Sequence, residues 1–198
     1  MRQRIIQRAS QLFRQRGYNG VSIDNLMSEA GLTRGGFYSH FKNKADLFAC
    51  VIEYDPELTQ RLRERDGKDP KALREGAIDI VQDYVSKRYR KQVLKGCSLA
   101  SLAMETSRAP AEAQCRYAAA IRDLAAELSR GVEANQSDSE RGKSNAASAP
   151  LDERALMAIV TALGGLVLAN ATAADRELAD SFSAAAQSQL AELLSDVV

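Results

Sequence analysis

Residues Ser22 to Phe48 read SIDNLMSEAGLTRGGFYSHFKNKADLF and contain two short stretches of helical periodicity separated by a glycine. Ser22 is a favourable N-cap for a first helix that runs to Ala30, and Gly31 permits a tight turn after it. Thr33 can cap a second short helix. Two short helices joined by such a turn are typical of a helix-turn-helix, whose second helix enters the major groove of DNA.

The second of these helices carries side chains that suit DNA. It begins with Thr33, Arg34 and two glycines, so a hydroxyl and a guanidinium lie at the end that approaches base edges. The groups that can donate to phosphate oxygens follow: Tyr38, His40, Lys42 and Lys44. Phe37 and Phe41 are expected to hold the unit together.

Charge is unevenly distributed along the chain of 198 residues. The first 50 residues carry eight Lys and Arg against three Asp and Glu, a net charge of +5, whereas the remainder carries 19 against 23, a net charge of −4. A basic head on a mildly acidic body indicates a polyanionic partner for the head alone.

Helical periodicity continues through almost the whole chain, and no segment alternates with the two-residue period of a half-buried strand. The fold class is therefore predicted to be all-α, with about nine helices. Beyond the two short helices, the expected helical segments are 2–16, 43–54, 70–89, 96–107, 111–132, 152–174 and 175–197. The charged run 61–68 is expected to be a solvated connector or a frayed extension, and 135–150, which lacks large apolar residues, a mobile surface loop.

The stretch from Ser22 to Phe48, with ASQLFRQRGYNGVS (Ala9 to Ser22) before it, resembles the signature of the tetracycline-repressor (TetR) family of transcriptional regulators. The positions that carry the resemblance are Thr33, Gly35, Tyr38, His40, Phe41, Lys44 and Leu47. The resemblance implies a three-helix head, residues 1–48, and a helical body for ligand binding and dimerisation, residues 49–198. It further implies a homodimeric repressor that a small-molecule effector releases from a near-palindromic, double-stranded DNA operator.

Carried over position by position, the resemblance implies a set of DNA contacts. Phosphates would be contacted by Ser22, Thr33, Tyr38, His40 and Lys44, and bases by Arg34, Gly35 and either Phe37 or Ser39. Arg34 is the strongest candidate for direct readout, because a guanidinium can bind O6 and N7 of guanine with two hydrogen bonds. The alternative is that Arg34 is an ordinary solvated helix residue.

The body offers side chains that could line an effector cavity or simply form core: Tyr84, Cys97, Met104, Tyr117 and Met157. Cys97 follows Gly96 at the expected start of a helix, with Lys95 close by, a position that favours a reactive thiolate. A repressor that senses oxidants or electrophiles through Cys97 is therefore an alternative function. A regulator that binds DNA without responding to any ligand is another.

Small residues that allow close helix approach predict a dimer interface, with intramolecular packing as the alternative. With their apolar neighbours, these residues are Gly164, Gly165, Ala169, Phe182, Ala185, Ala186 and Leu190. The uncharged stretch Ala155 to Ala174 is long enough to cross a bilayer. Its glycines and its lack of flanking aromatic anchors instead favour a helix buried in the domain and against a second subunit, so no membrane partner is expected.

No class of enzyme is indicated. The sequence shows no nucleophile with a base, no paired carboxylates and no phosphate-binding glycine loop. One histidine and three cysteines without CxxC spacing argue against a metal site, and no cofactor is expected. The odd number of cysteines and the absence of a signal-peptide pattern predict a cytoplasmic protein.

Overall fold

The computed structural model describes residues 1–54, 57–65, 67, 69–86, 98–130 and 151–195. Within these ranges the chain is helical and has no strand, which confirms the predicted all-α class. Two compact units are present, Met1–Glu57 with Gln92–Ile121 and Leu58–Lys91 with Arg122–Val198. We call them the N-terminal unit and the C-terminal unit.

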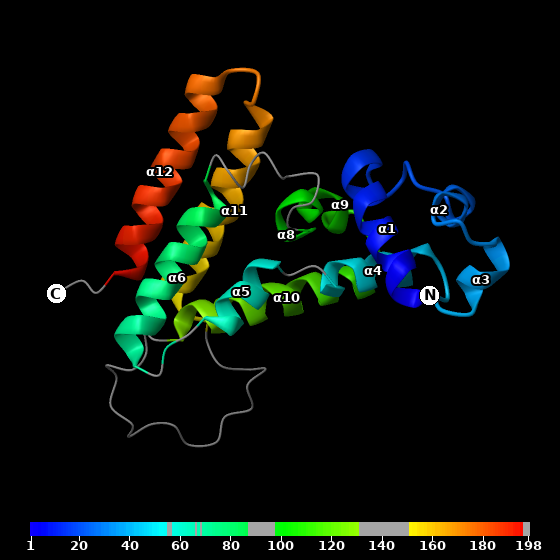
Figure 1. The fold of residues 1–198 in the computed structure, drawn as a ribbon, viewed down its shortest axis with the longest axis horizontal. Helices are drawn as coiled ribbons and strands as arrows, with labels where there is room; N and C mark the ends of the chain where they lie inside the picture. Colours follow the sequence, from blue (N-terminus) through cyan, green and yellow to red (C-terminus); the bar gives the residue numbers. More distant parts are fainter. Residues whose placement is uncertain (55–56, 66, 68, 87–97, 131–150, 196–198) are drawn as a thin grey trace. The chain divides into compact units, whose positions relative to one another are not determined.

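The N-terminal unit contains two groups of helices that are far apart in the sequence (Figure 1). They are α1 (Arg2–Arg16), α2 (Ile23–Glu29), α3 (Arg34–Tyr38), α4 (Lys44–Tyr54), α8 (Ser98–Ser101), α9 (Ala103–Ser107) and the first part of α10 (Ala111–Ser129). Helix α1 packs on α4 and α2, and both α1 and α4 contact α8. In Figure 1, α2 and α3 lie on the other side of α1 from α8 and α9.

Local sequence explains where the first helices begin and end. Gly17 ends α1 with a φ of 70°, a left-handed conformation that glycine adopts without strain. Ser22 Oγ accepts a hydrogen bond of 3.1 Å from the N–H three residues on, which caps α2. Before α4, Asn43 Oδ1 accepts from the Asp46 N–H, and Asp46 Oδ2 accepts from the Lys42 N–H, both at 2.9 Å. This reciprocal pair confirms the start predicted for α4.

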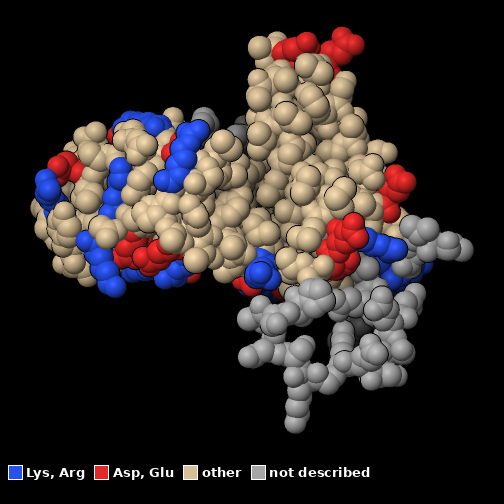
Figure 2. All heavy atoms as spheres, turned by 180° about the vertical axis from the view of Figure 1, so that it is seen from behind, with Lys and Arg blue, Asp and Glu red and all other residues tan. Residues whose placement is uncertain are grey.

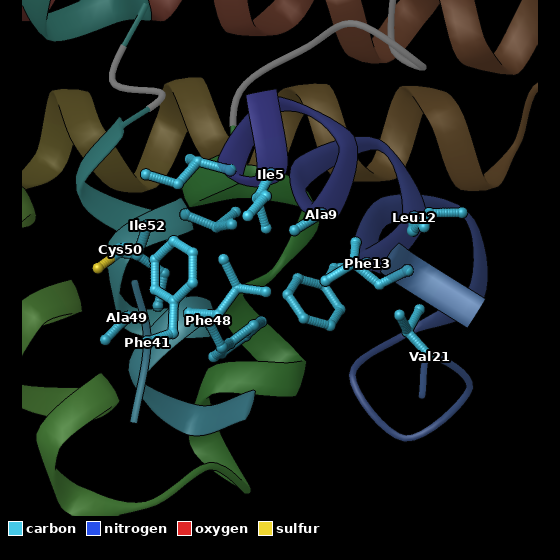
Figure 3. Packing of buried hydrophobic residues seen from close by; sticks show 14 of the residues in the cluster. Ile5, Ala9, Leu12, Phe13, Val21, Phe41, Phe48, Ala49, Cys50 and Ile52 are labelled. Atoms are coloured by element: carbon cyan, nitrogen blue, oxygen red, sulfur yellow. The ribbon is translucent and has the colours of Figure 1, made fainter. Parts of the chain in front are cut away.

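The core of the N-terminal unit joins both groups of helices. Helices α1 and α4 contribute Ile5, Ala9, Leu12, Phe13, Phe48 and Ile52, all buried (Figure 3). The rings of Phe13 and Phe48 meet edge to face with centroids 5.2 Å apart. Leu102, Ala109 and Ala113 belong to the same cluster. The division into a head of residues 1–48 and a body of residues 49–198 stays a prediction, and the compact unit that holds the head also includes residues 98–121.

The C-terminal unit is built on three long helices, with a shorter helix before them. These are α5 (Glu57–Glu64), α6 (Pro70–Tyr84), α11 (Glu153–Ala171) and α12 (Arg176–Leu194). Helices α11 and α12 form an extensive antiparallel pair, and α6 packs against both (Figure 1). A Cβ placed on Gly165 of α11 would lie 2.6 Å from the Cβ of Ala186 in α12, so the absence of a side chain allows this close packing.

A buried arginine follows α5. The side chain of Arg65 is 2% exposed, and its guanidinium donates only to backbone carbonyls. The acceptors are the carbonyl oxygens of Leu62 (2.5 Å), Glu127 (2.6 Å), Arg130 (2.9 Å) and Leu73 (3.0 Å). Burial, and then the charge of Arg130, lower the pKa of Arg65, while Glu127 opposes this effect. Arg65 thereby joins the ends of α5 and α10 to α6.

One face of α11 is apolar and exposed. Met157, Val160, Val167 and Leu168 are between 45% and 66% exposed. Among the described residues this helix alone is long and apolar enough to cross a membrane, with 33% of its most apolar window buried. Within a single chain α11 is buried on one side, and its predicted burial against a second subunit stays a prediction.

Three expectations about the helices need correction. Much of the charged run 61–68 belongs to α5, because Leu58 and Leu62, one turn apart, are both buried. Helix α6 ends at Tyr84, not near residue 89, and the single helix expected within 96–107 is divided into α8 and α9. The predicted mobile loop 135–150 lies outside the described residues.

Candidate nucleic-acid interface

The orientation of α3 is set by Phe37 on its inner side and by Phe41, which follows the helix. Phe37 is completely buried and Phe41 is 2% exposed, with their ring centroids 5.5 Å apart. Helix α3 packs on α2, whose Leu26 and Met27 are also buried. Because α3 has only five residues, this anchoring directs its remaining side chains to the surface.

The outward side of α3 presents most of the predicted contacts. Thr33, Arg34, Gly35, Tyr38 and Ser39 are all exposed. The Thr33 side chain makes no capping hydrogen bond, and a Cβ on Gly35 would meet nothing within 4 Å. The backbone of α3 can therefore approach a groove closely at Gly35.

Four other predicted contacts have different surroundings. Phe37 does not fit the predicted base contact, because it has no exposed surface and forms core. Ser22 is exposed but caps α2, and His40 is half-buried with its ring 6.4 Å from that of Phe41. Lys44 is half-buried.

Lys44 holds the turn between α1 and α2. Its ammonium donates to the carbonyl oxygens of Tyr18 (3.0 Å) and Val21 (3.1 Å) and lies 4.2 Å from the centre of the Tyr18 ring. Burial lowers the pKa of Lys44. From α9, Glu105 accepts a hydrogen bond of 3.0 Å from the Tyr18 N–H. The turn before the helix-turn-helix is thus held by one cation and one anion.

Arg34 has an acidic partner on α2. Its Nη1 donates to both carboxylate oxygens of Asp24, at 2.8 and 3.0 Å. Both side chains remain well exposed, Arg34 at 63% and Asp24 at 59%. A hydrogen bond with Tyr38, followed by the charge of Asp24, raises the pKa of Arg34 above its usual value. The guanidinium is therefore charged and held at the first turn of α3.

Cations also surround the helix-turn-helix on α1. Figure 2 shows Lys and Arg side chains over the surface of the N-terminal unit, with acidic groups between them. Arg8 (2.5 Å) and Arg16 (2.9 Å) both pair with Glu29 at the end of α2. These arginines give the surface around the helix-turn-helix cations of the kind that bind phosphates, and Glu29 holds two of them in place.

The described effector candidates fall in both units, and their expected role in an effector cavity stays a prediction. Tyr84 is buried in the C-terminal unit, whereas Met104 and Tyr117 belong to the N-terminal unit, where the Tyr117 hydroxyl donates to the Leu99 carbonyl at 2.6 Å. Met104 is 66% exposed and Met157 is 48% exposed. Cys97 lies outside the described residues. A shallow hollow of about 230 Å³ has other residues around it: Arg4, Gln7, Arg8, Gln11, Glu29 and Ala30.

The predicted dimer residues divide into an inner and an outer group. Ala169, Ala186 and Leu190 are buried within the chain, and Gly165 faces Ala186. Phe182 and Gly164 are partly exposed, Ala185 is exposed, and a Cβ on Gly164 would meet no neighbour. In this outer group, Gly164 lies on α11, which also carries the exposed apolar residues, and Phe182 and Ala185 lie on α12.

Sequence reasoning assigned no role to Asp24 or Glu105. The contact of Asp24 with Arg34 could have been predicted, because a residue in the first turn of α2 can face the first turn of α3 in a helix-turn-helix. Glu105 gave no local signal, since 87 residues separate it from Tyr18. Among the described residues, no group of three or more His, Cys, Asp or Glu side chains could hold a metal ion.

The N-terminal part of the chain is similar in sequence to known proteins. The family described as "Bacterial regulatory proteins, tetR family" matches residues 5–51. HTH-type transcriptional regulator AcrR of Shigella flexneri is 33% identical over 99 residues, which cover 48% of this chain and 46% of AcrR. The Transposon Tn10 TetC protein of Escherichia coli is 45% identical over 51 residues, 26% of each chain. The chain thus spans less than half the length of these relatives.

The similarity in fold extends over more of the chain than the similarity in sequence. A TetR-family transcriptional regulator from Cytophaga hutchinsonii has a TM-score of 0.66 and 19% identity, covering 96% of this chain and 93% of that one. The SmeT–triclosan complex has a TM-score of 0.64 and 20% identity, covering 98% and 89%. Residues 5–51 are thus similar in sequence to the tetR family of bacterial regulatory proteins, and the chain has the fold of solved regulators of that family.

Proposed function

We propose that this protein is a sequence-specific transcriptional regulator, a homodimeric repressor that a small-molecule effector releases from a near-palindromic DNA operator. The observation that carries the DNA-binding part is the exposed row Thr33, Arg34, Gly35 and Tyr38 on α3, held in place by the buried Phe37. A hydroxyl, a guanidinium, an open backbone and a phenol suit base edges and phosphates in a major groove. The similarity of residues 5–51 to the tetR family supports the same function.

A homodimer is supported by the C-terminal unit. The residues Met157, Val160, Gly164 and Val167 recur every three or four positions and form one exposed face of α11. Figure 2 shows that the α11–α12 pair has a largely uncharged surface in this view. A self-complementary interface would cover this apolar face and place two heads on two half-sites.

Release by an effector rests on the family and on one structural neighbour. The protein in the SmeT–triclosan complex binds triclosan and shares this fold at 20% identity. An effector that binds the body would lower operator affinity by the same factor by which the operator lowers effector affinity. A panel of small molecules screened by thermal shift would identify such a ligand, because a ligand that binds only folded protein raises the melting temperature.

The DNA-binding function is tested by selecting genomic DNA fragments with the purified full-length protein over a series of salt concentrations. We expect a near-palindromic motif whose two half-sites are about one helical turn, or a multiple of it, apart. Arg34→Ala is expected to blur one base-pair position in each half-site and to weaken operator binding by about 5- to 150-fold. The matched control is Arg108→Ala, which removes an exposed cation of the same unit that lies after α9 rather than on the helix-turn-helix.

Two outcomes would contradict the proposal. Recovery of fragments without any shared motif at every salt concentration would show a generic polyanion binder. An equal loss of operator affinity in Arg34→Ala and Arg108→Ala would show that α3 does not read the sequence.

A further inference from the structure

We propose that Asp24 is a positioning residue that orients the Arg34 guanidinium toward one base pair and thereby helps to set the sequence specificity of the head. This inference rests on the proposed function. Asp24 belongs to α2, the first helix of the helix-turn-helix, and it accepts both of its hydrogen bonds from the same nitrogen of Arg34.

The first argument is geometric. The Nη1 atom lies 2.8 and 3.0 Å from the two carboxylate oxygens, so Asp24 fixes one end of the guanidinium. A guanidinium has five donor hydrogens in a rigid plane, and the contacts of Nη1 with Asp24 leave the donors of the other nitrogens for a base edge. Fixing one nitrogen of a planar group also fixes the direction of the others. Asp24 therefore determines where the remaining donors of Arg34 point.

The second argument concerns energy. A free arginine side chain loses many rotamers on binding, and an arginine that is already held loses fewer. Both side chains are more than half exposed, so this ion pair adds little to folding stability. A pair that adds little to stability but holds the candidate base-reading side chain is therefore better explained by preorganisation for binding.

The third argument concerns charge. Asp24 places a carboxylate on the surface that faces phosphate groups, where it repels DNA of any sequence. A carboxylate there weakens sequence-independent binding, while the oriented guanidinium strengthens binding to one base pair. Both effects increase the ratio of specific to non-specific affinity.

The experiment measures binding of full-length protein by fluorescence anisotropy to three kinds of duplex. These are the operator recovered by fragment selection, a set with every single base-pair replacement, and a scrambled duplex. The variants are Asp24→Asn, Arg34→Ala and the double variant. Asp79→Asn is the matched control, because it removes the same charge from an exposed position on α6.

At the base pair that Arg34→Ala ceases to discriminate, we expect Asp24→Asn to lose about tenfold in discrimination. Its affinity for scrambled duplex is expected to rise about three- to tenfold at low salt. In the Arg34→Ala background, Asp24→Asn is expected to change discrimination no further. Asp79→Asn is expected to match the unmodified protein on every duplex.

Three results would overturn the inference. If Asp24→Asn binds all duplexes more tightly by the same factor, Asp24 acts only by repulsion. If discrimination falls equally at base pairs that Arg34 does not read, Asp24 supports the head as a whole. If the unmodified protein prefers no duplex, the proposed function fails as well. Asp24→Ser, which also suits the first turn of a helix, repeats the test with a different side chain, and thermal melting of each variant confirms folding.

Discussion

Replacing Arg65 by methionine should destabilise the C-terminal unit far more than replacing an exposed arginine would. Arg65 donates to four backbone carbonyls at 2.5 to 3.0 Å. Hydrogen bonds to a charged group each contribute about 1.5 to 3 kcal/mol, so four would contribute about 6 to 12 kcal/mol. Burial of one ion costs several kcal/mol, and methionine removes that cost. The expected net loss is about 3 to 5 kcal/mol in the free energy of unfolding.

The assay is urea unfolding followed by circular dichroism at a fixed protein concentration, with extrapolation to water. Arg63→Met is the matched control, because Arg63 is on the same segment and pairs with Glu127 at 3.3 Å but is 59% exposed. Because the Arg63 side chain is largely solvated, this pair should contribute less than about 1 kcal/mol. If the two variants differ by less than about 1 kcal/mol, the carbonyl contacts of Arg65 do not hold the unit together.

Three further predictions follow from burial, packing and charge. Phe37→Ala empties a fully buried site and should lower the free energy of unfolding by about 3 to 5 kcal/mol in urea, with loss of operator binding in a gel shift. Gly165→Ala brings a Cβ to within 2.6 Å of that of Ala186 and should lower the free energy of unfolding by about 1 to 3 kcal/mol. Gly164→Ala meets no neighbour within the chain and should raise the free energy of unfolding by up to about 1 kcal/mol. Equal melting temperatures of the two variants would contradict this prediction. Desolvation alone would raise the pKa of Glu29, but its hydrogen bonds with two arginines keep that pKa below the ordinary value of 4.5. The stability that these bonds provide should therefore be full above pH 4.5 and disappear as the pH falls through the lower folded pKa, and an acid titration should show a smaller loss for Glu29→Gln.

The local features of the fold were predictable because single residues determine them. Gly17, Ser22, Asn43, Asp69 and Asp175 mark helix ends through backbone conformation or capping, and all five do so in the structure. The exposed side of α3 was predictable for the same reason, since five residues with one buried ring leave few choices.

Features that depend on tertiary packing were not predictable from the sequence. The burial of Leu58 and Leu62 stabilises a helix in a charged run. The sequence around these two leucines does not reveal that they are buried. The sequence predicts a solvated Arg65, whereas in the structure its guanidinium donates to four backbone carbonyls. The sequence resemblance predicts a phosphate contact for Lys44, whose ammonium donates to two carbonyls of its own chain. For Arg65 and Lys44, contacts with residues more than 20 positions away in the sequence determine the environment.

The turn at Tyr18 limits how freely this head can be exchanged with that of a relative. Its N–H is bound by Glu105 and its carbonyl by Lys44, so both sides of one residue depend on charged groups from later in the chain. A chimaera that carries only residues 1–57 into a foreign body would lose Glu105 and the apolar cover of Leu102 and Ala113. We therefore expect α3 to keep its proposed sequence specificity in another regulator only when residues 98–121 are transferred with it.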